Sequence, residues 1–138
     1  MKEFSTHWKS SKNPKKQRKY RFTAPLHIKH KFVSAHLSKE LIKKYKRRSF
    51  PLKKGDKVKI MRGQFTKKEG KIARVNLRHT KVFIEGMEKT RKDGTKSLLP
   101  FHPSNLLILE LNLEDKRRKE KLDGKTEKPA EKAVREKK

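Results

Sequence analysis

The sequence predicts a mainly β protein built on a small β-barrel over residues 51–111. Two observations lead to this fold class. Apolar residues in this stretch alternate with cations at a period of two, which places aliphatic side chains on one face of a strand. Turn residues separate the alternating runs at short intervals, as in a barrel that closes its own edges. Because only 30% of the 138 residues are apolar and the formal net charge is +27, the remainder cannot pack a core of its own.

Residues 1–22 are predicted to form an extended basic arm. The first fifty residues hold sixteen Lys and Arg against two acids, so this run is either a solvated tail or a segment that binds a polyanion. Its cations are too dense for one face of a helix, and Pro14 disfavours a helix there. Tyr20 and Phe22 interrupt the run, and their rings can either stack on RNA bases or pack on the barrel. The aromatic rings favour the nucleic-acid arm over the solvated tail.

Residues 23–50 are predicted to form two short helices ahead of the barrel. Thr23 can cap the first helix, with Pro25 in its first turn. Ser38 can cap the second helix, which runs to Tyr45.

Four strands and one hairpin are expected within the barrel. The strands centre on Val58 and Ile60, on residues 72–75, on Val82 and Ile84, and on residues 106–111. The last run is apolar on both faces, so we expect it to be buried. The pair Asp93-Gly94 lies between two apolar runs and predicts a hairpin, because both residues tolerate positive φ.

Behind the barrel, residues 112–124 are predicted to form a helix and residues 125–138 a charged tail. Asn112 can cap this helix, with Glu114 and Asp115 in its first turn and Lys and Arg in later turns, an order that suits the helix dipole. The tail mixes both charges with small residues, so it is expected to be disordered when the protein is alone.

The composition argues against several classes of function. The chain has no Cys, which removes disulfides, thiolate metal sites and Cys nucleophiles. His27, His30 and His36 lie close in sequence, but few acids accompany them, so contacts with RNA are favoured over zinc. The acids are scattered, and there is no phosphate loop or dinucleotide fingerprint. The longest aliphatic run, residues 106–109, is far shorter than a membrane span. We expect a soluble, intracellular protein that is no enzyme, holds no metal or cofactor, does not insert into membranes and is not a homo-oligomer.

Residues 55–75 resemble a KOW motif. A Gly55-Asp56 turn precedes an alternating strand, and Gly63, a loop and then Gly70 precede the next strand. Gly63 and Gly70 bracket a loop in which the backbone has to turn tightly and can approach phosphates with no Cβ in the way. The resemblance implies an SH3-like barrel. It is shared by ribosomal proteins and transcription elongation factors.

One position departs from this motif. Ribosomal proteins with this motif commonly carry a second loop glycine where this chain has Lys67, which follows Phe65-Thr66. The loop is therefore expected to be less tightly folded than in its relatives. In exchange, Lys67 and Lys68 are expected to add contacts with phosphates.

The segments around the motif resemble one ribosomal family in particular, large-subunit ribosomal protein twenty-four in the universal numbering, called twenty-six in eukaryotes. The resemblance covers about residues 10–120 of this chain. It rests on residues 11–19 and 24–29, on Leu37-Ser38-Lys39-Glu40-Leu41 with Lys44-Tyr45, and on His102-Pro103-Ser104-Asn105. Gly86 after Ile84-Glu85, together with Phe101-His102, looks closer to archaeal than to eukaryotic members.

The resemblance implies a structural role in the large subunit of the cytoplasmic ribosome. Members bind the first domain of large-subunit rRNA beside the exit of the nascent-peptide tunnel, among neighbouring large-subunit proteins, and aid early assembly. By similarity, residues 12–21 thread into rRNA and the hairpin at residues 87–96 lies near the tunnel rim. The residues expected to contact rRNA are Lys12, Lys15, Lys16, Arg18, Lys19, Tyr20, Arg21, Lys29, Lys31, Arg62, Gly63, Lys67, Lys68, Arg74, Arg78, His102 and Ser104.

A KOW-type module of a transcription elongation factor is the alternative. Those proteins usually join the barrel to an acid-bearing α/β domain. Here basic, core-poor residues precede Gly55 instead, so the ribosomal function is favoured.

Overall fold

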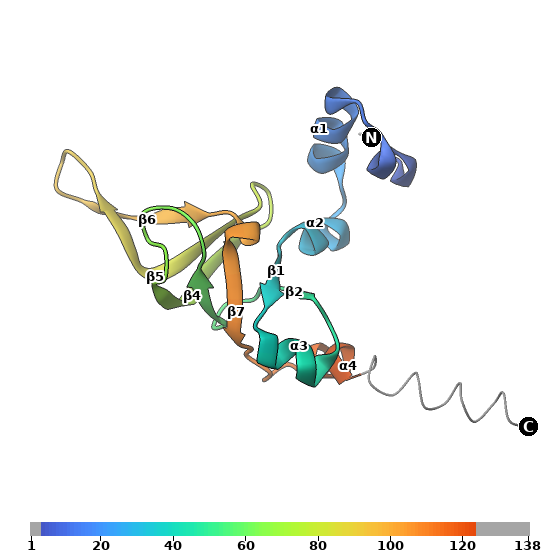
Figure 1. Cartoon of the computed structure of the whole chain (residues 1–138). Helices are drawn as coiled ribbons and strands as arrows, with labels where there is room; N and C mark the ends of the chain where they lie inside the picture. Colours follow the sequence, from blue (N-terminus) through green and yellow to red (C-terminus); the bar gives the residue numbers. More distant parts are fainter. Residues whose placement is uncertain (1–3, 124–138) are drawn as a thin grey trace, which may run out of the picture.

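The computed structural model describes residues 4–123, which are built around one seven-stranded sheet (Figure 1). Neighbouring strands are antiparallel except β1 and β7, which run parallel. In space the strands follow the order β2-β1-β7-β3-β4-β5-β6. Along the chain the elements are η1 (Thr6–Ser10), α1 (Pro14–Thr23), α2 (Leu26–Phe32), β1 (Ser34–Leu37), α3 (Lys39–Tyr45), β2 (Ser49–Pro51), β3 (Lys57–Ile60), β4 (Glu69–Asn76), β5 (Lys81–Thr90), β6 (Lys96–Phe101), η2 (Pro103–Asn105), β7 (Leu106–Glu110) and α4 (Lys116–Asp123).

The mainly β class is confirmed, and the sheet is consistent with a small KOW or SH3-like fold, but it does not close into a barrel. β7 pairs with β3 on one side and with β1 on the other, so no side of β7 remains for β6. β2 and β6 therefore stand at opposite ends of the strand order. β1 and most of β2 come from a segment predicted to be helical. They add two strands beyond β7, so the sheet continues there instead of closing onto β6.

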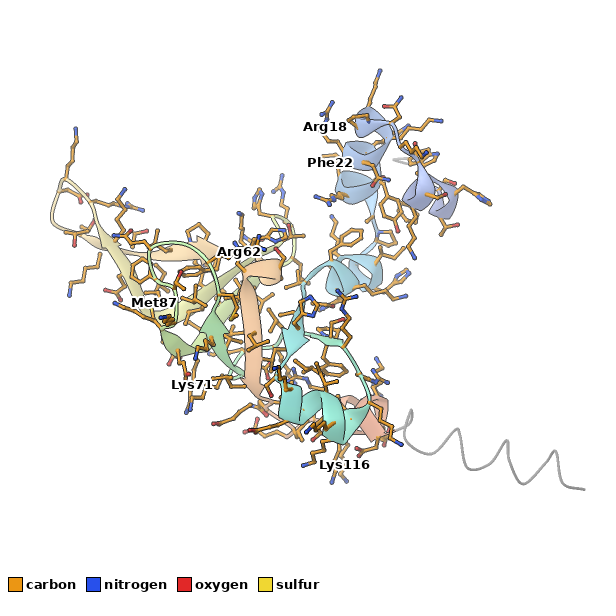
Figure 2. All side chains as sticks on the ribbon, viewed as in Figure 1. Arg18, Phe22, Arg62, Lys71, Met87 and Lys116 are labelled. Atoms are coloured by element: carbon orange, nitrogen blue, oxygen red, sulfur yellow. The ribbon has the colours of Figure 1, made fainter. Side chains whose placement is uncertain are left out.

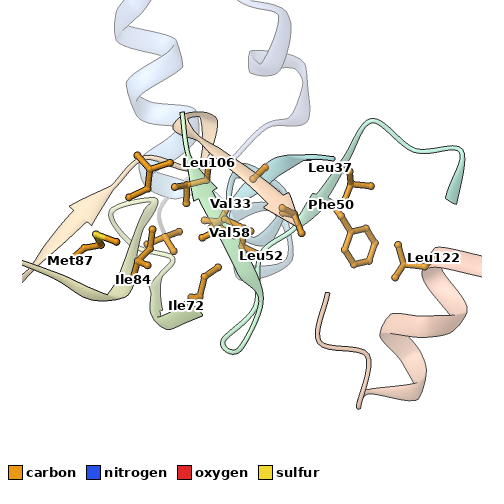
Figure 3. Packing of buried hydrophobic residues seen from close by; sticks show 14 of the residues in the cluster. Val33, Leu37, Phe50, Leu52, Val58, Ile72, Ile84, Met87, Leu106 and Leu122 are labelled. Atoms are coloured by element: carbon orange, nitrogen blue, oxygen red, sulfur yellow. The ribbon is translucent and has the colours of Figure 1, made fainter. Parts of the chain in front are cut away.

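The core of the sheet contains aliphatic residues of all four strands that the sequence predicted. These residues are at most 1% exposed: Val58, Ile60, Ile72, Val82, Ile84, Leu106 and Ile108. Figure 3 shows Val58, Ile72, Ile84 and Leu106 gathered beneath the strands, with Leu122 of α4 beside Phe50 and Leu37 at the other end of the cluster. The last strand, β7, buries Leu106 and Ile108 fully, and its alternate residues are half-buried, as expected for a strand covered on both faces.

The predicted extended arm is wrong, because residues 14–23 form the helix α1 and residues 6–10 a 3₁₀ turn. Pro14 occupies the first turn, where its missing N–H costs nothing and its fixed φ suits the helix. The side chain of Asn13 caps this turn by accepting the N–H of Lys15 at 2.9 Å. The Gln17 amide donates to the carbonyls of Trp8, Lys9 and Ser11 and so ties η1 to α1.

The two helices expected in residues 23–50 are present, although the first starts later than predicted. Thr23 ends α1 and donates its hydroxyl to the Lys19 carbonyl at 2.7 Å, and Pro25 stands before α2. Ser38 caps α3 as predicted, accepting the N–H of Leu41 at 3.4 Å.

The C-terminal helix α4 begins at residue 116 rather than directly after Asn112. Asp115 accepts the N–H of Arg117 at 3.0 Å and so caps the helix. Asn112 instead accepts the N–H of Glu114 in the preceding turn. The predicted tail at residues 125–138 lies outside the described residues, as do Gly124 and residues 1–3.

A buried ion pair joins α4 to the sheet. The Arg118 guanidinium donates to both carboxylate oxygens of Asp56, at 2.7 and 2.6 Å, and the two side chains are 8% and 0% exposed. The same carboxylate accepts the backbone N–H groups of Lys53 and Asn112. Arg118 also donates to the carbonyls of Asn112 and Pro51. Asp56 was predicted only as a turn residue. Its carboxylate in fact attaches α4 to the segment between β2 and β3.

Candidate nucleic-acid interface

The predicted cations of the arm are held on the surface of the N-terminal helices. This group consists of Lys12, Lys15, Lys16, Arg18, Lys19 and Arg21, all exposed. They surround α1 on every side except the one that carries Tyr20. Figure 2 shows Arg18 and Phe22 on this helix at the upper end of the molecule, and Lys71 and Lys116 at the lower end.

Tyr20 does not offer its ring to RNA. Its side chain is 7% exposed, and its ring stacks on Phe4 at 5.3 Å and meets the edge of Phe32 at 5.7 Å. Tyr20 therefore forms a small core for the arm, apart from the sheet, and of the two roles open to its ring the structure shows packing. Phe22, by contrast, is 62% exposed.

The β3–β4 loop turns as the motif requires, and it explains the departure at residue 67. Lys67 has a φ of +70°, the left-handed conformation that glycine adopts without strain. The loop is nevertheless closed, because Lys67 N–H donates to the Ile60 carbonyl at 2.8 Å and Ile60 N–H to the Lys68 carbonyl at 3.0 Å. Two backbone hydrogen bonds therefore hold the loop together around Lys67. Lys67 and Lys68 are exposed at its tip, as are Arg62 and Gly63 at its start.

The glycines of the motif have two different roles. Gly55 and Gly63 have φ values of +88° and +95° and form the turns on either side of β3. Gly70 lies inside β4, where an added Cβ would come within 2.7 Å of Ile84 Cγ2 and 3.1 Å of the Glu85 carbonyl. Gly70 is therefore required for close packing of β4 on β5, and the predicted approach of its backbone to phosphates is not what fixes this position.

The remaining predicted cations are distributed over the sheet and α2. Arg74 is exposed on β4 and places its guanidinium 4.6 Å above the Phe83 ring. Arg78 is exposed in the β4–β5 turn, and Lys29 and Lys31 lie on α2. A cavity of about 390 Å³ brings Arg78 and Lys29 together with Phe22, Thr23, Ala24 and Leu26.

His102 and Ser104 stand at the start of η2. The Nδ1 atom of His102 accepts the Ser104 N–H at 3.3 Å and lies 2.8 Å from the Ser104 hydroxyl, so the imidazole is hydrogen-bonded within its own turn. Burial lowers the pKa of His102, and the nearby charges of Lys81 and Arg21 lower it further. This histidine is therefore neutral at pH 7, and the shift shows that cations of the arm and of β5 face the same place.

A second cationic surface was missed from the sequence. Two adjoining cavities of about 470 and 480 Å³ share His30, Leu52 and Lys53. Cations from the β2–β3 segment, from β4 and from α4 line them, together with two histidines of α2 and the carboxylate of Asp115: Lys53, Lys54, Arg74, Arg117, Arg118 and Lys121 are the cations, and His27 and His30 the histidines. The spacing of Arg117 and Lys121, four residues apart on one helix face, was the one available signal.

Several acids on or beside the sheet form ion pairs with lysines of the same molecule. Glu69 lies 3.6 Å from Lys59, Glu110 3.2 Å from Lys57 and Asp115 3.3 Å from Lys53. Together with the buried Asp56, these pairs reduce the number of acids in residues 4–123 that can offset the exposed cations. Over the same residues, His, Asp and Glu form no group of three able to hold a metal ion. Nor does any helix in that range have the length and apolarity needed to cross a membrane.

These features define a class: a small, strongly basic, β-rich protein of the KOW type. The family model that describes the eukaryotic ribosomal proteins L26 and their archaeal counterparts matches residues 11–125. The chain is also similar to the large ribosomal subunit protein uL24 of Methanosphaera stadtmanae, with 47% identity over 83% of this chain and 98% of the relative. The corresponding protein of Methanothrix thermoacetophila is 48% identical over 78% of this chain and 93% of its own length.

The chain belongs to this family of ribosomal proteins. The family is a structural, non-enzymatic class, and it confirms the predicted ribosomal localisation in the cytoplasm. The match extends from the arm through α4, so it covers both cationic surfaces described above. It also agrees with the resemblance carried by the flanks of the motif rather than with the elongation-factor alternative.

Proposed function

We propose that this ribosomal protein is a structural constituent of the large subunit that binds the first domain of its rRNA beside the exit of the nascent-peptide tunnel. Neighbouring large-subunit proteins at that exit are its other partners, and early binding aids assembly. The observation that carries the proposal is the distribution of charge. The chain has a net charge of +27, and four of its acids, one buried and three exposed, already pair with Lys or Arg of the same molecule. A surface of this kind requires a polyanion to neutralise it.

The two cationic surfaces suit the proposed role because they lie on different parts of the molecule. One surrounds the cavity lined by Lys29 and Arg78, and the other surrounds the two adjoining cavities lined by Lys53, Lys54, Arg74, Arg117 and Lys121. A protein that offers phosphate contacts in two places can hold two RNA helices together. This is the work of a structural rRNA-binding protein, and no reaction is needed for it.

The absence of Cys from the chain makes a direct test possible. Single cysteines introduced as Lys15→Cys in α1 and Lys92→Cys in the β5–β6 turn can each carry an iron chelate that cleaves nearby RNA. In reconstituted large subunits, we expect Lys15→Cys to cleave the first rRNA domain and Lys92→Cys to cleave rRNA at the tunnel exit. Cleavage confined to other domains, or failure of the wild-type chain to enter large subunits, would refute the proposal.

A further inference from the structure

The two most exposed large apolar side chains of the N-terminal helices lie side by side at one cavity. Phe22 at the end of α1 is 62% exposed, and Leu26 at the start of α2 is 64% exposed. Both line the cavity of about 390 Å³, together with Thr23 and Ala24 of the connecting turn. Exposed apolar groups that gather at a hollow, rather than standing singly, indicate a binding site.

The cavity is also lined by two cations. Lys29 comes from α2 and Arg78 from the β4–β5 turn, so the site joins the arm to the sheet. No acid is among the lining residues. A cavity lined by apolar side chains and by two cations matches a group that is flat and apolar at one end and anionic at the other.

We propose that this cavity receives one unstacked nucleotide of RNA. Its base stacks on the Phe22 ring and is covered by Leu26, while its flanking phosphates lie on Lys29 and Arg78. Aromatic rings and guanidinium groups are the side chains that hold splayed-out bases, and the volume accommodates a base with its ribose. The inference rests on the proposed RNA-binding function. It adds one specific contact, which recognises an unstacked base and not only the phosphate charge.

A pair of model RNAs tests the proposal with the full-length protein. One is a hairpin with a single bulged 2-aminopurine, and the other is the same hairpin with an abasic nucleotide at the bulge. Because stacking on an aromatic ring is worth about 1–3 kcal/mol per base, the wild-type protein is expected to bind the first RNA roughly 5- to 150-fold more tightly. The fluorescence of the 2-aminopurine should also change on binding, which shows directly that the base has moved.

Variants then assign this preference to the cavity. Phe22→Ala and Leu26→Ala should remove most of the preference while leaving the affinity for the abasic hairpin unchanged, and Phe22→Tyr should keep it. Arg78→Ala should weaken binding of both hairpins alike and reduce the salt slope by about 1. Ile42→Ala on α3 is the matched control, since Ile42 is also an exposed aliphatic residue but lies on another helix, and it should change nothing. The altered side chains are exposed, so a thermal melt should show all variants folded.

The outcomes separate this inference from the proposed function. If the wild-type protein binds both hairpins equally well, the nucleotide site is refuted. The same holds if Phe22→Ala and Ile42→Ala prefer the 2-aminopurine hairpin over the abasic hairpin to the same degree. In both cases the protein still binds RNA, so the proposed function stands. Chemical probing of assembled large subunits gives a second test. Subunits that carry Phe22→Ala with Leu26→Ala should expose at least one base to dimethyl sulfate that stays protected in Ile42→Ala subunits. An unchanged pattern means that a segment of a neighbouring protein, or nothing, fills the cavity, and it overturns the inference.

Discussion

The sheet and the arm with its following helix (residues 4–32) are stabilised in different ways. The sheet buries a continuous cluster that reaches from β1 to α4. In residues 4–32 the buried residues are Tyr20 and Ala24, and neither belongs to that cluster. Helix α1 also places Lys15 and Lys19 four residues apart, an arrangement of like charges that weakens a helix. The sheet therefore carries its own stability, whereas the arm depends on caps, on one aromatic cluster and on neutralisation of its cations.

The largest effect is expected where α4 is locked onto the sheet. Asp56→Ala leaves Arg118 buried without its partner, and breaking such a pair costs about 3–5 kcal/mol. Asp115→Ala removes an exposed pair with Lys53 and the α4 cap, so it should be clearly less destabilising than Asp56→Ala. Urea unfolding of the wild type and both variants measures the difference. Equal destabilisation by the two substitutions would contradict the role given to the buried pair.

The next effect should fall on the arm alone. Tyr20→Ala removes the ring that joins Phe4 and Phe32, at a cost of about 3 kcal/mol, which is enough to unfold so small a cluster. Hydrogen exchange should then show fast exchange throughout α1, with the amides of β3, β4 and β7 still protected. Tyr20→Phe keeps the ring contacts and serves as the control. Loss of protection in the sheet would show that the two regions fold as one unit.

A smaller effect is expected at the closest approach of two strands. Gly70→Ala places a methyl group 2.7 Å from Ile84 Cγ2, and overpacking of this kind costs about 1–3 kcal/mol. Lys71→Ala, at the exposed neighbouring position, should change the free energy of unfolding by about 0.5 kcal/mol or less. If Gly70→Ala leaves the free energy of unfolding unchanged, β4 and β5 can move apart to admit the methyl group, and Gly70 is not required for their packing.

The smallest effect concerns the left-handed residue in the β3–β4 loop. Lys67→Gly relieves the strain of a φ of +70° and should raise stability by about 0.5–1 kcal/mol, after the entropy of the freer unfolded chain is counted. It also removes one cation and should reduce the salt slope of RNA binding by about 1. Lys68→Gly loses the same charge without relieving such strain, so it should be destabilised. Equal stability changes in both variants would argue against the strain at Lys67.

Local patterns predicted more of the sheet than of the arm. Alternation located β3 and β5, short apolar runs located β4 and β7, and Asp93-Gly94 located the β5–β6 hairpin, where Gly94 has a φ of +80°. The arm was misjudged because Pro14 was treated as a residue that prevents a helix, although it is favoured in a first turn. The density of cations gave no help, since a helix can be basic on every exposed side.

Contacts between distant residues explain what the sequence did not reveal. β1 is four residues long, and its parallel pairing with β7 joins residues 36–37 to residues 107–108. Asp56 and Arg118 are also far apart along the chain, and nothing local marks them as partners. For the candidate interface, charge and aromatic content indicated which residues to consider. Only the structure separated the buried Tyr20 from the exposed Phe22 and brought Phe22 together with Arg78.

The salt dependence of binding to a transcript of the first domain of large-subunit rRNA tests the central claim most directly. If about ten cations of the two surfaces meet phosphates, a plot of log affinity against log salt has a slope of about −7 to −9. The account predicts this slope, with Lys15→Ala and Arg117→Ala each making it shallower by about 1. A slope of about −2, or equal affinity for a DNA duplex of the same length, would contradict the claim that the protein is bound through rRNA phosphates.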